Sequence, residues 1–361
     1  MRIAAIDLGT VTARLLIADV DVSNANRSSA TNPNVSIVTP NNPNNLNLNP
    51  TNPNSTNPNS TPIPIPNNPI HEIERRMRIT HLGEHLAETG VISPAAIERE
   101  RAACKDFLST IRAVEARDDR PVERIVAVAT SAMRDARNSA EVCAALADVG
   151  LTVEVIGGLR EAQLSFSGTL SGFVTTSEQS VLTVDVGGGS TEILLGTLAP
   201  ARPPRILREQ SFDIGSRRLT DCFLPNDPPS AEDIAQAEAW VYKGMRPFFS
   251  NFECRPAAMI AVAGTATTVV SVRDKMAVYD PWRVHGSRVE AEELAKVLND
   301  LAKFDTEQRA ACVGLEAGRA PVIIGGLITL RAVLNLAGLT SFLVSETDIL
   351  HGLILSVKTA G

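Results

Sequence analysis

The sequence predicts an α/β protein made of two similar halves that face each other across a cleft. Apolar, strand-like runs alternate with helix-like segments along the chain, which is the pattern of α/β folds. The segment DLGTVTARLLI, which begins at Asp7, also matches DVGGGSTEILL, which begins at Asp185. An internal duplication at this separation indicates two like domains. The length of 361 residues, 44% of them hydrophobic, suits two domains better than one.

The first half alternates between strands and helices. Its strand runs are apolar or alternate in polarity, and its helical segments carry an apolar stripe. The first long helix has Ser93 as its N-cap, with Glu98 and other charges along its outer face, and the next helix ends at Gly150. In chain order, we expect strands at 2–10, 13–20, 72–82, 124–130 and 151–157, and helices at 93–116, 138–150 and 159–173.

The second half repeats this scheme. It opens on a buried strand, a Gly-rich turn and a second apolar strand, as the first half does. Helices follow from about Ser230, and the last strand reads SFLVSETD. We expect strands at 180–190, 191–198, 205–215, 257–265 and 341–348, with helices in the intervening segments.

One segment does not fit a globular fold. From about Val22 to Pro69 the chain is dominated by Asn and Pro and has no apolar periodicity. Such a segment cannot bury enough apolar surface to offset its ordering entropy, so we predict disorder. It is either a tolerated surface insertion between two strands or a tether, and the low closure cost of long loops favours the insertion.

Composition excludes several classes of protein. The formal charge of −7 disfavours a general DNA-binding surface. The five cysteines form no CxxC pair or Cys/His cluster, so we expect reduced, mostly buried thiols in a cytoplasmic protein. The N-terminus lacks the pattern of a signal peptide, and no apolar run reaches the roughly 18 residues that a membrane helix needs.

Both matched segments place an aspartate at a strand end and follow it with glycine and hydroxyl residues. Asp and repeated Gly weaken a strand, so this position needs a carboxylate and bare backbone more than stability. A Gly-rich turn lets backbone N–H groups approach an anion, which predicts a phosphate cradle. A single such turn could be an ordinary hairpin, but the pair in register favours the cradle. The candidate phosphate-binding residues are Gly9, Thr10 and Thr12, then Gly187, Gly188, Gly189, Ser190 and Thr191, and, at a third Gly-rich strand end, Gly264 and Thr265.

The two aspartates suggest a metal ion. A carboxylate repels phosphate, so Asp7 and Asp185 make sense if a hard divalent cation lies between carboxylate and phosphate, partly through water. We expect Mg²⁺, with Mn²⁺ as the alternative.

These features resemble the superfamily of actin, sugar kinases and Hsp70-type ATPases, which is built on two ribonuclease-H-like domains. Within it, the chain resembles the exopolyphosphatases and guanosine pentaphosphate phosphohydrolases over nearly its whole length outside the Asn/Pro-rich segment. It has the form of a short member without the C-terminal HD-type domain. The segments that carry the resemblance are AAIDLGT, VAVATSAMRDARNS, VEVIGGLREAQLSF, VDVGGGSTEILLG, SFDIGSRRLTDCFL, RAPVIIGGLITL and LVSETDILHGL.

The resemblance implies a reaction and a set of roles. Water would attack the terminal phosphate of inorganic polyphosphate or of guanosine pentaphosphate (pppGpp) with the help of Mg²⁺. Glu161 matches the catalytic glutamate that orients or deprotonates the water, and Arg134 matches an arginine that neutralises phosphate. Asp185 would hold the metal, with Glu192 in support and Asp7 sharing the task.

The resemblance also implies an organisation. Domain I would comprise residues 1–163 and a C-terminal helix at 346–361 that packs back on it, with the disordered insert at 22–69. Domain II would comprise residues 164–345. A homodimer is common in the family.

Two departures from the family pattern keep other functions open. Val11 replaces an asparagine at the first turn, which leaves that phosphate site to backbone groups. Arg160 replaces an acidic residue before Glu161 and either favours a polyanion or faces solvent. A non-catalytic sensor of guanosine tetra- and pentaphosphate or polyphosphate is therefore one alternative. The other is an ATP-dependent kinase of the same superfamily, although no residues indicate an adenosine pocket.

Overall fold

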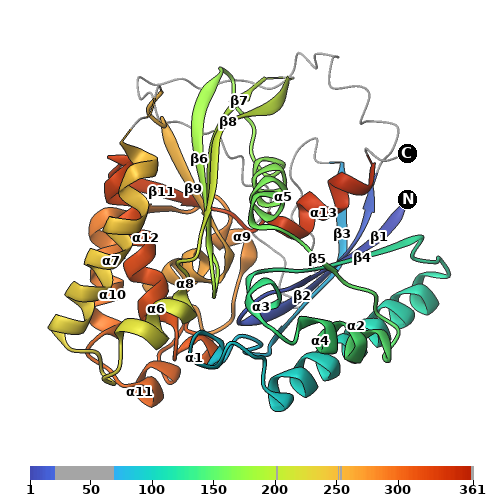
Figure 1. The fold of residues 1–361 in the computed structure, drawn as a ribbon. Coiled ribbons are helices and arrows are strands. Elements are labelled where there is room, and N and C mark those ends of the chain that lie inside the picture. The colour runs from blue at the N-terminus through green and yellow to red at the C-terminus, as the bar shows by residue number, and fades with distance from the viewer. Residues whose placement is uncertain (21–68, 201, 251, 253, 359–361) are drawn as a thin grey trace.

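The structure is a computed structural model that describes residues 1–20, 69–200, 202–250, 252 and 254–358 (Figure 1). The Asn/Pro-rich segment predicted at 22–69 lies outside these ranges except for residue 69, so the disorder of this segment stays a prediction. Within the described ranges, no helix is long and apolar enough to cross a membrane.

The first half is built on a five-stranded mixed sheet in the order β3-β2-β1-β4-β5. β1 pairs antiparallel with β2 and parallel with β4, so the first strand lies at the centre of the sheet. The strands are β1 (Arg2–Leu8), β2 (Thr12–Val20), β3 (Ile70–Ile79), β4 (Arg124–Ala129) and β5 (Glu154–Val155). The helices are α1 (Leu86–Thr89), α2 (Pro94–Asp118), α3 (Ser131–Asp135), α4 (Ser139–Ala147) and α5 (Gly158–Leu170).

Both faces of this sheet are buried. Alternate residues of β1 point to opposite faces, as the pleat of a strand requires. Ala4 and Ile6 pack with the side chains of α2 and α4, whereas Ile3 and Ala5 pack with the C-terminal helix α13 (Ile349–Lys358). The predicted return of the last helix to the first half is therefore confirmed, and Figure 1 shows α13 beside these strands.

The second half is built on a six-stranded mixed sheet in the order β10-β11-β9-β6-β7-β8. Its strands are β6 (Gln179–Val186), β7 (Thr191–Ala199), β8 (Arg202–Phe212), β9 (Ala258–Val262), β10 (Arg288–Glu290) and β11 (Ser341–Val344). Its helices are α6 (Ser216–Phe223), α7 (Ala231–Phe249), α8 (Ala263–Arg273), α9 (Pro281–Val284), α10 (Ala291–Leu301), α11 (Thr306–Ala310), a 3₁₀ turn (Ala317–Arg319) and α12 (Ile323–Ala337). The α/β fold class is as the sequence predicts.

The duplicated segments form equivalent hairpins. β1 pairs with β2 so that Asp7 lies opposite Arg14, and β6 pairs with β7 so that Asp185 lies opposite Glu192. Equivalent hydrogen bonds close the two turns, from Gly9 N to Thr12 O at 2.9 Å and from Gly187 N to Ser190 O at 3.0 Å. The alignment of the two halves therefore holds at the level of individual hydrogen bonds.

We propose the division of the chain into residues 1–163 with the C-terminal helix, and residues 164–345. Helix α5 lies between the two sheets in Figure 1 and packs on α13 as well as on β7 and β8. The proposed boundary falls inside this helix, so α5 belongs to both halves.

The structure corrects four details of the prediction. Glu100, expected among the outward charges of α2, is fully buried. The predicted strand at 151–157 is reduced to the two residues of β5, and α6 was not expected. All five cysteines are free, but Cys104 alone is buried, while Cys222 and Cys254 are exposed.

Candidate active site

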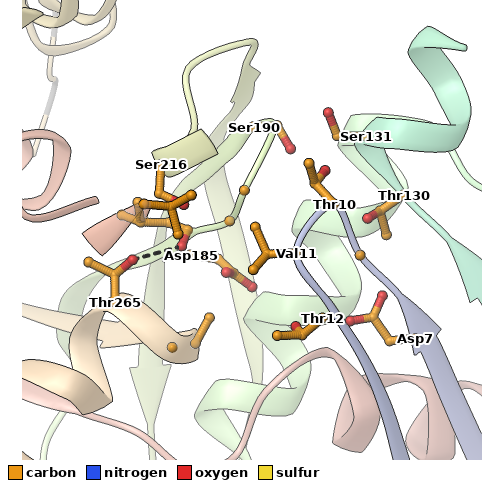
Figure 2. Close-up of a pocket in the computed structure, with 18 of the residues that line it drawn as sticks. Asp7, Thr10, Val11, Thr12, Thr130, Ser131, Asp185, Ser190, Ser216 and Thr265 are labelled. Carbon is orange, nitrogen blue, oxygen red and sulfur yellow. Dashed lines mark hydrogen bonds between the residues drawn. The ribbon is translucent and has the colours of Figure 1, made fainter. Parts of the chain in front are cut away.

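The two hairpin turns and the N-terminus of α8 line one pocket in the cleft between the halves (Figure 2). The pocket has a volume of about 70 Å³, well below the roughly 300–1,000 Å³ of typical ligand pockets. The first half contributes Asp7, Gly9, Thr10, Val11, Thr12, Arg14, Thr130, Ser131 and Glu161. The second half contributes, among others, Asp185, Gly187, Gly188, Gly189, Ser190, Ser216, Gly264, Thr265 and Arg319.

The turns face each other at contact distance, which explains two of the glycines. A Cβ atom on Gly189 would lie 2.3 Å from Ser131 Oγ, and one on Gly188 would lie 2.7 Å from a Val11 methyl. Any side chain at these two positions would force the halves apart. Val11 itself is buried against the second turn.

Asp7 and Asp185 approach the pocket from opposite halves, as Figure 2 shows. Asp7 Oδ2 accepts hydrogen bonds from Arg14 Nε at 3.1 Å and from Arg14 Nη2 at 2.5 Å. Arg14 Nη1 also binds Asp348 Oδ2 at 2.5 Å, which ties this turn to the segment before α13. Within the described residues Asp185 forms no ion pair, and its Oδ2 accepts a hydrogen bond from Ser165 Oγ at 2.9 Å.

The pKa values of both aspartates indicate excess buried negative charge. Burial raises the pKa of Asp185 to about 6, against the attraction of Arg14, and also raises the pKa of Asp7. Each carboxylate is further destabilised by repulsion from Asp348. Moreover, Asp7 Oδ1 is buried without a hydrogen-bond partner. A cation between the carboxylates would relieve this charge.

This donor set fits a divalent cation that completes its coordination with water and phosphate. Among the described residues, no three His, Cys, Asp or Glu side chains are grouped so as to hold a metal by themselves. Mg²⁺ commonly binds through only one or two carboxylates together with substrate phosphates. Asp185 is the better-placed candidate ligand, because Arg14 already neutralises the charge of Asp7, whereas the hydrogen bond from Ser165 leaves Asp185 its charge.

Glu161 and Arg134 form a close ion pair beside the turns. Glu161 lies in the first turn of α5, and its Oε2 accepts a hydrogen bond from Arg134 Nη1 at 2.5 Å. Arg134 also contacts the Ile156 carbonyl at 3.2 Å and Ser190 Oγ at 3.5 Å, so it joins the two halves. Burial raises the pKa of Glu161 to about 7, although Arg134 favours the charged form.

Glu192 lies behind the pocket rather than in it. Its Oε1 accepts a hydrogen bond from Ser211 Oγ at 2.7 Å, and its carboxylate is almost completely buried. Burial, together with repulsion from Glu161 and Asp185, raises its pKa well above the usual range for a glutamate. Thr191 is also turned away, since its hydroxyl donates to the Ile214 carbonyl at 2.5 Å. The other predicted phosphate-binding residues line the pocket.

Several pocket residues were not selected from the sequence. Thr130 and Ser131 bring two more hydroxyl groups from the ATSAMRDARN segment, and Ser216 brings another from the start of α6. Arg14 and Arg319 bring the guanidinium groups of the pocket lining. The signal for Thr130, Ser131 and Arg319 was available, because each lies in or beside a segment that carries the family resemblance.

The chain is similar to curated proteins over almost its whole length. The chain is 33% identical over 367 residues to "Exopolyphosphatase 2" of Mycobacterium tuberculosis, an alignment that covers 99% of this chain and 98% of that protein. It is 31% identical to a "Bifunctional 3-dehydroquinate synthase/phosphatase" of Fusobacterium nucleatum, over 98% of this chain but 46% of that longer protein.

Solved structures show the same fold. A crystal structure of an exopolyphosphatase-like protein superposes with a TM-score of 0.77 at 27% identity, covering 99% of this chain and 97% of the other. The Aquifex aeolicus PPX-GPPA enzyme superposes with a TM-score of 0.69 at 25% identity, covering 99% of both chains.

The two mixed sheets and the paired Gly-rich turns define an α/β protein of the actin-like ATPase type with a pocket between its two halves. More narrowly, the Ppx/GppA phosphatase family matches residues 65–359, and the chain belongs to that family.

Proposed function

We propose that the protein is an exopolyphosphatase, which releases the terminal phosphate of inorganic polyphosphate. One observation carries the proposal: three Gly-rich strand ends and the buried glutamate Glu161 line a single pocket. The names of two relatives from Mycobacterium tuberculosis, "Exopolyphosphatase 2" and "Exopolyphosphatase 1", support the same activity.

Glu161 acts as the general base. It holds a water molecule in line with the terminal phosphorus and takes a proton from it as the water attacks. A bond forms between the water oxygen and phosphorus, the phosphoanhydride bond to the rest of the chain breaks, and one inorganic phosphate leaves. Arg134 fixes the orientation of Glu161 through the hydrogen bond at 2.5 Å.

The Gly-rich turns bind the terminal phosphate. Their backbone N–H groups and the hydroxyl groups of Thr10, Thr12 and Ser190 donate hydrogen bonds to its oxygens. Arg319 contributes positive charge from the second half. Asp185, with Asp7 across the pocket, would hold Mg²⁺ or Mn²⁺. A bound cation would supply Lewis-acid chemistry, because it would withdraw charge from the phosphate oxygens and make the phosphorus easier to attack.

Guanosine pentaphosphate is the alternative substrate, because its terminal phosphoanhydride presents the same chemistry to this pocket. A direct assay separates the possibilities. Purified protein is given Mg²⁺ and, in parallel, long-chain polyphosphate, tripolyphosphate, pppGpp or ATP, and phosphate release is followed. We expect release from long-chain polyphosphate that stops when EDTA removes the metal. No release from any of the four would refute a hydrolase and favour the sensor.

A further inference from the structure

Ser165 makes a buried hydrogen bond to one of the pocket aspartates. It lies in the middle of α5 and is 3% exposed. Its hydroxyl donates to Asp185 Oδ2 at 2.9 Å, a bond that joins α5 to the end of β6 across the interior of the protein.

A serine at this position needs an explanation. Its neighbours on α5, Ala162, Leu164 and Phe166, are buried apolar residues of the core. Serine is a mediocre helix former in a helix interior, and burying a hydroxyl costs free energy unless it is hydrogen-bonded. An apolar side chain would therefore suit the packing better. The hydroxyl instead donates its hydrogen bond to the carboxylate of Asp185.

The position of Ser165 on its helix links it to the catalytic glutamate. Residues four apart lie on the same face of a helix, one turn from each other. Helix α5 therefore presents Glu161 in its first turn, to the pocket that Asp185 also lines, and Ser165 in the next turn, to the carboxylate of Asp185 itself. One rigid element thus supports two parts of the site.

We propose that Ser165 is a positioning residue that fixes the carboxylate of Asp185 for a divalent cation. The hydrogen bond holds Oδ2 toward α5 and leaves the other oxygen for the pocket that Asp185 lines. Asp7 has no equivalent, since its Oδ2 is bound by Arg14 instead. The proposal rests on the proposed function. Hydrogen bonds that orient a metal ligand typically contribute about 10–100-fold in metal affinity or activity.

The test measures Mn²⁺ binding to the protein without substrate, by electron paramagnetic resonance of the free ion. We expect Ser165→Ala to weaken Mn²⁺ binding about tenfold or more, whereas Ser165→Thr, which keeps the hydroxyl, restores it. In phosphate release, Ser165→Ala should raise the Mg²⁺ concentration needed for half-maximal rate more than it lowers kcat at saturating Mg²⁺. The matched control is Ser271→Ala, which removes another buried hydroxyl that donates to backbone carbonyls, including Gly314 at 2.6 Å.

A double-variant cycle keeps the test decisive if Ser165→Thr packs poorly. If Ser165 acts through Asp185, adding Ser165→Ala to Asp185→Asn causes no further loss of Mn²⁺ binding. Independent, additive losses would overturn the proposal. The proposal would also be overturned if Ser165→Ala bound Mn²⁺ within twofold of wild type while its melting temperature fell, because the hydroxyl would then have a structural role only. Failure of the wild-type protein to bind Mn²⁺ would refute the metal-dependent function as well as this inference.

Discussion

Glu100 should make the protein less stable as the pH rises through neutrality. This side chain of α2 is fully buried, and neither carboxylate oxygen has a hydrogen-bond partner. The Thr80 hydroxyl is near enough to favour the charged form, but it falls short of hydrogen-bond geometry. Burial, with added repulsion from Asp7, raises the pKa of Glu100 from 4.5 to about 7.

The size of the effect follows from this pKa difference. Between pH 4.5 and 7 the folded protein keeps a proton on Glu100 that the unfolded chain has released, so stability falls as pH rises through that window. One pKa unit corresponds to about 1.4 kcal/mol, so the charged carboxylate costs the folded state about 3 kcal/mol above pH 7. Glutamine has nearly the same shape and no charge. We therefore expect the free energy of unfolding of Glu100→Gln, relative to that of wild type, to be about 2–3 kcal/mol higher at pH 8 than at pH 5.

The assay is urea unfolding followed by circular dichroism at pH 5 and pH 8, on wild type and variant. Comparing the two proteins cancels the contribution of the other buried carboxylates. The matched control is Glu98→Gln, two residues away. The Glu98 side chain is 63% exposed and forms a surface pair with Arg101, so its loss should cost less than about 1 kcal/mol at both pH values. If wild type and Glu100→Gln show the same pH dependence, the reasoning about a buried carboxyl at this position is wrong.

Three further predictions concern the proposed site and the Asn/Pro-rich segment. Glu161→Gln should slow phosphate release by about 10²–10⁴-fold without loss of polyphosphate binding, and a variant with more than a tenth of wild-type turnover would exclude the assigned role. The wild-type rate should rise with pH up to about 7, because the raised pKa keeps Glu161 protonated below that pH. Val11→Asn should lower the free energy of unfolding by about 1–3 kcal/mol with no gain in kcat/KM, because the amide would replace a methyl packed against Gly188. A higher kcat/KM at unchanged melting temperature would instead mean that the first turn is a weakened phosphate site. Replacing residues 24–68 by a short Gly/Ser joint should change neither melting temperature nor activity, because Val20 and Ile70 already lie side by side in β2 and β3; a large loss of either would show that the segment is required.

The sequence identified the parts of the site that depend on local chemistry. An aspartate at a strand end, glycines that allow close approach and hydroxyls at matched places are visible in ten residues of chain, and both hairpins have the expected form. The helix N-cap at Ser93 was also predictable, because its hydroxyl accepts from Ala96 N within the same turn.

The remaining features depend on contacts between distant segments. Glu100 belongs to a run of charged residues, and two of the groups that act on its pKa, Thr80 and Asp7, lie on segments far from it in the sequence. Arg14 acquires its role only because Asp348, more than 300 residues later, returns to it. Glu161 and Arg134 were each selected from the sequence, but their direct pairing at 2.5 Å was not, since no local pattern brings α3 and α5 together.

The duplicated hairpins differ at one position, where the first has a basic residue and the second an acidic one. Across the strand pair, Asp7 faces an arginine, whereas Asp185 faces a glutamate at the equivalent place. The first hairpin is neutral at these two positions, whereas the second places two acidic side chains opposite each other. Burial, with repulsion from Glu161 and Asp185, holds the pKa of Glu192 well above its usual range. Two identical copies would have formed a site with twofold symmetry, in which a cation and a phosphate could exchange places without cost. The replacement of a basic residue by an acidic one removes that symmetry, so a cation and an anion bound in the cleft have one preferred order rather than two equivalent ones.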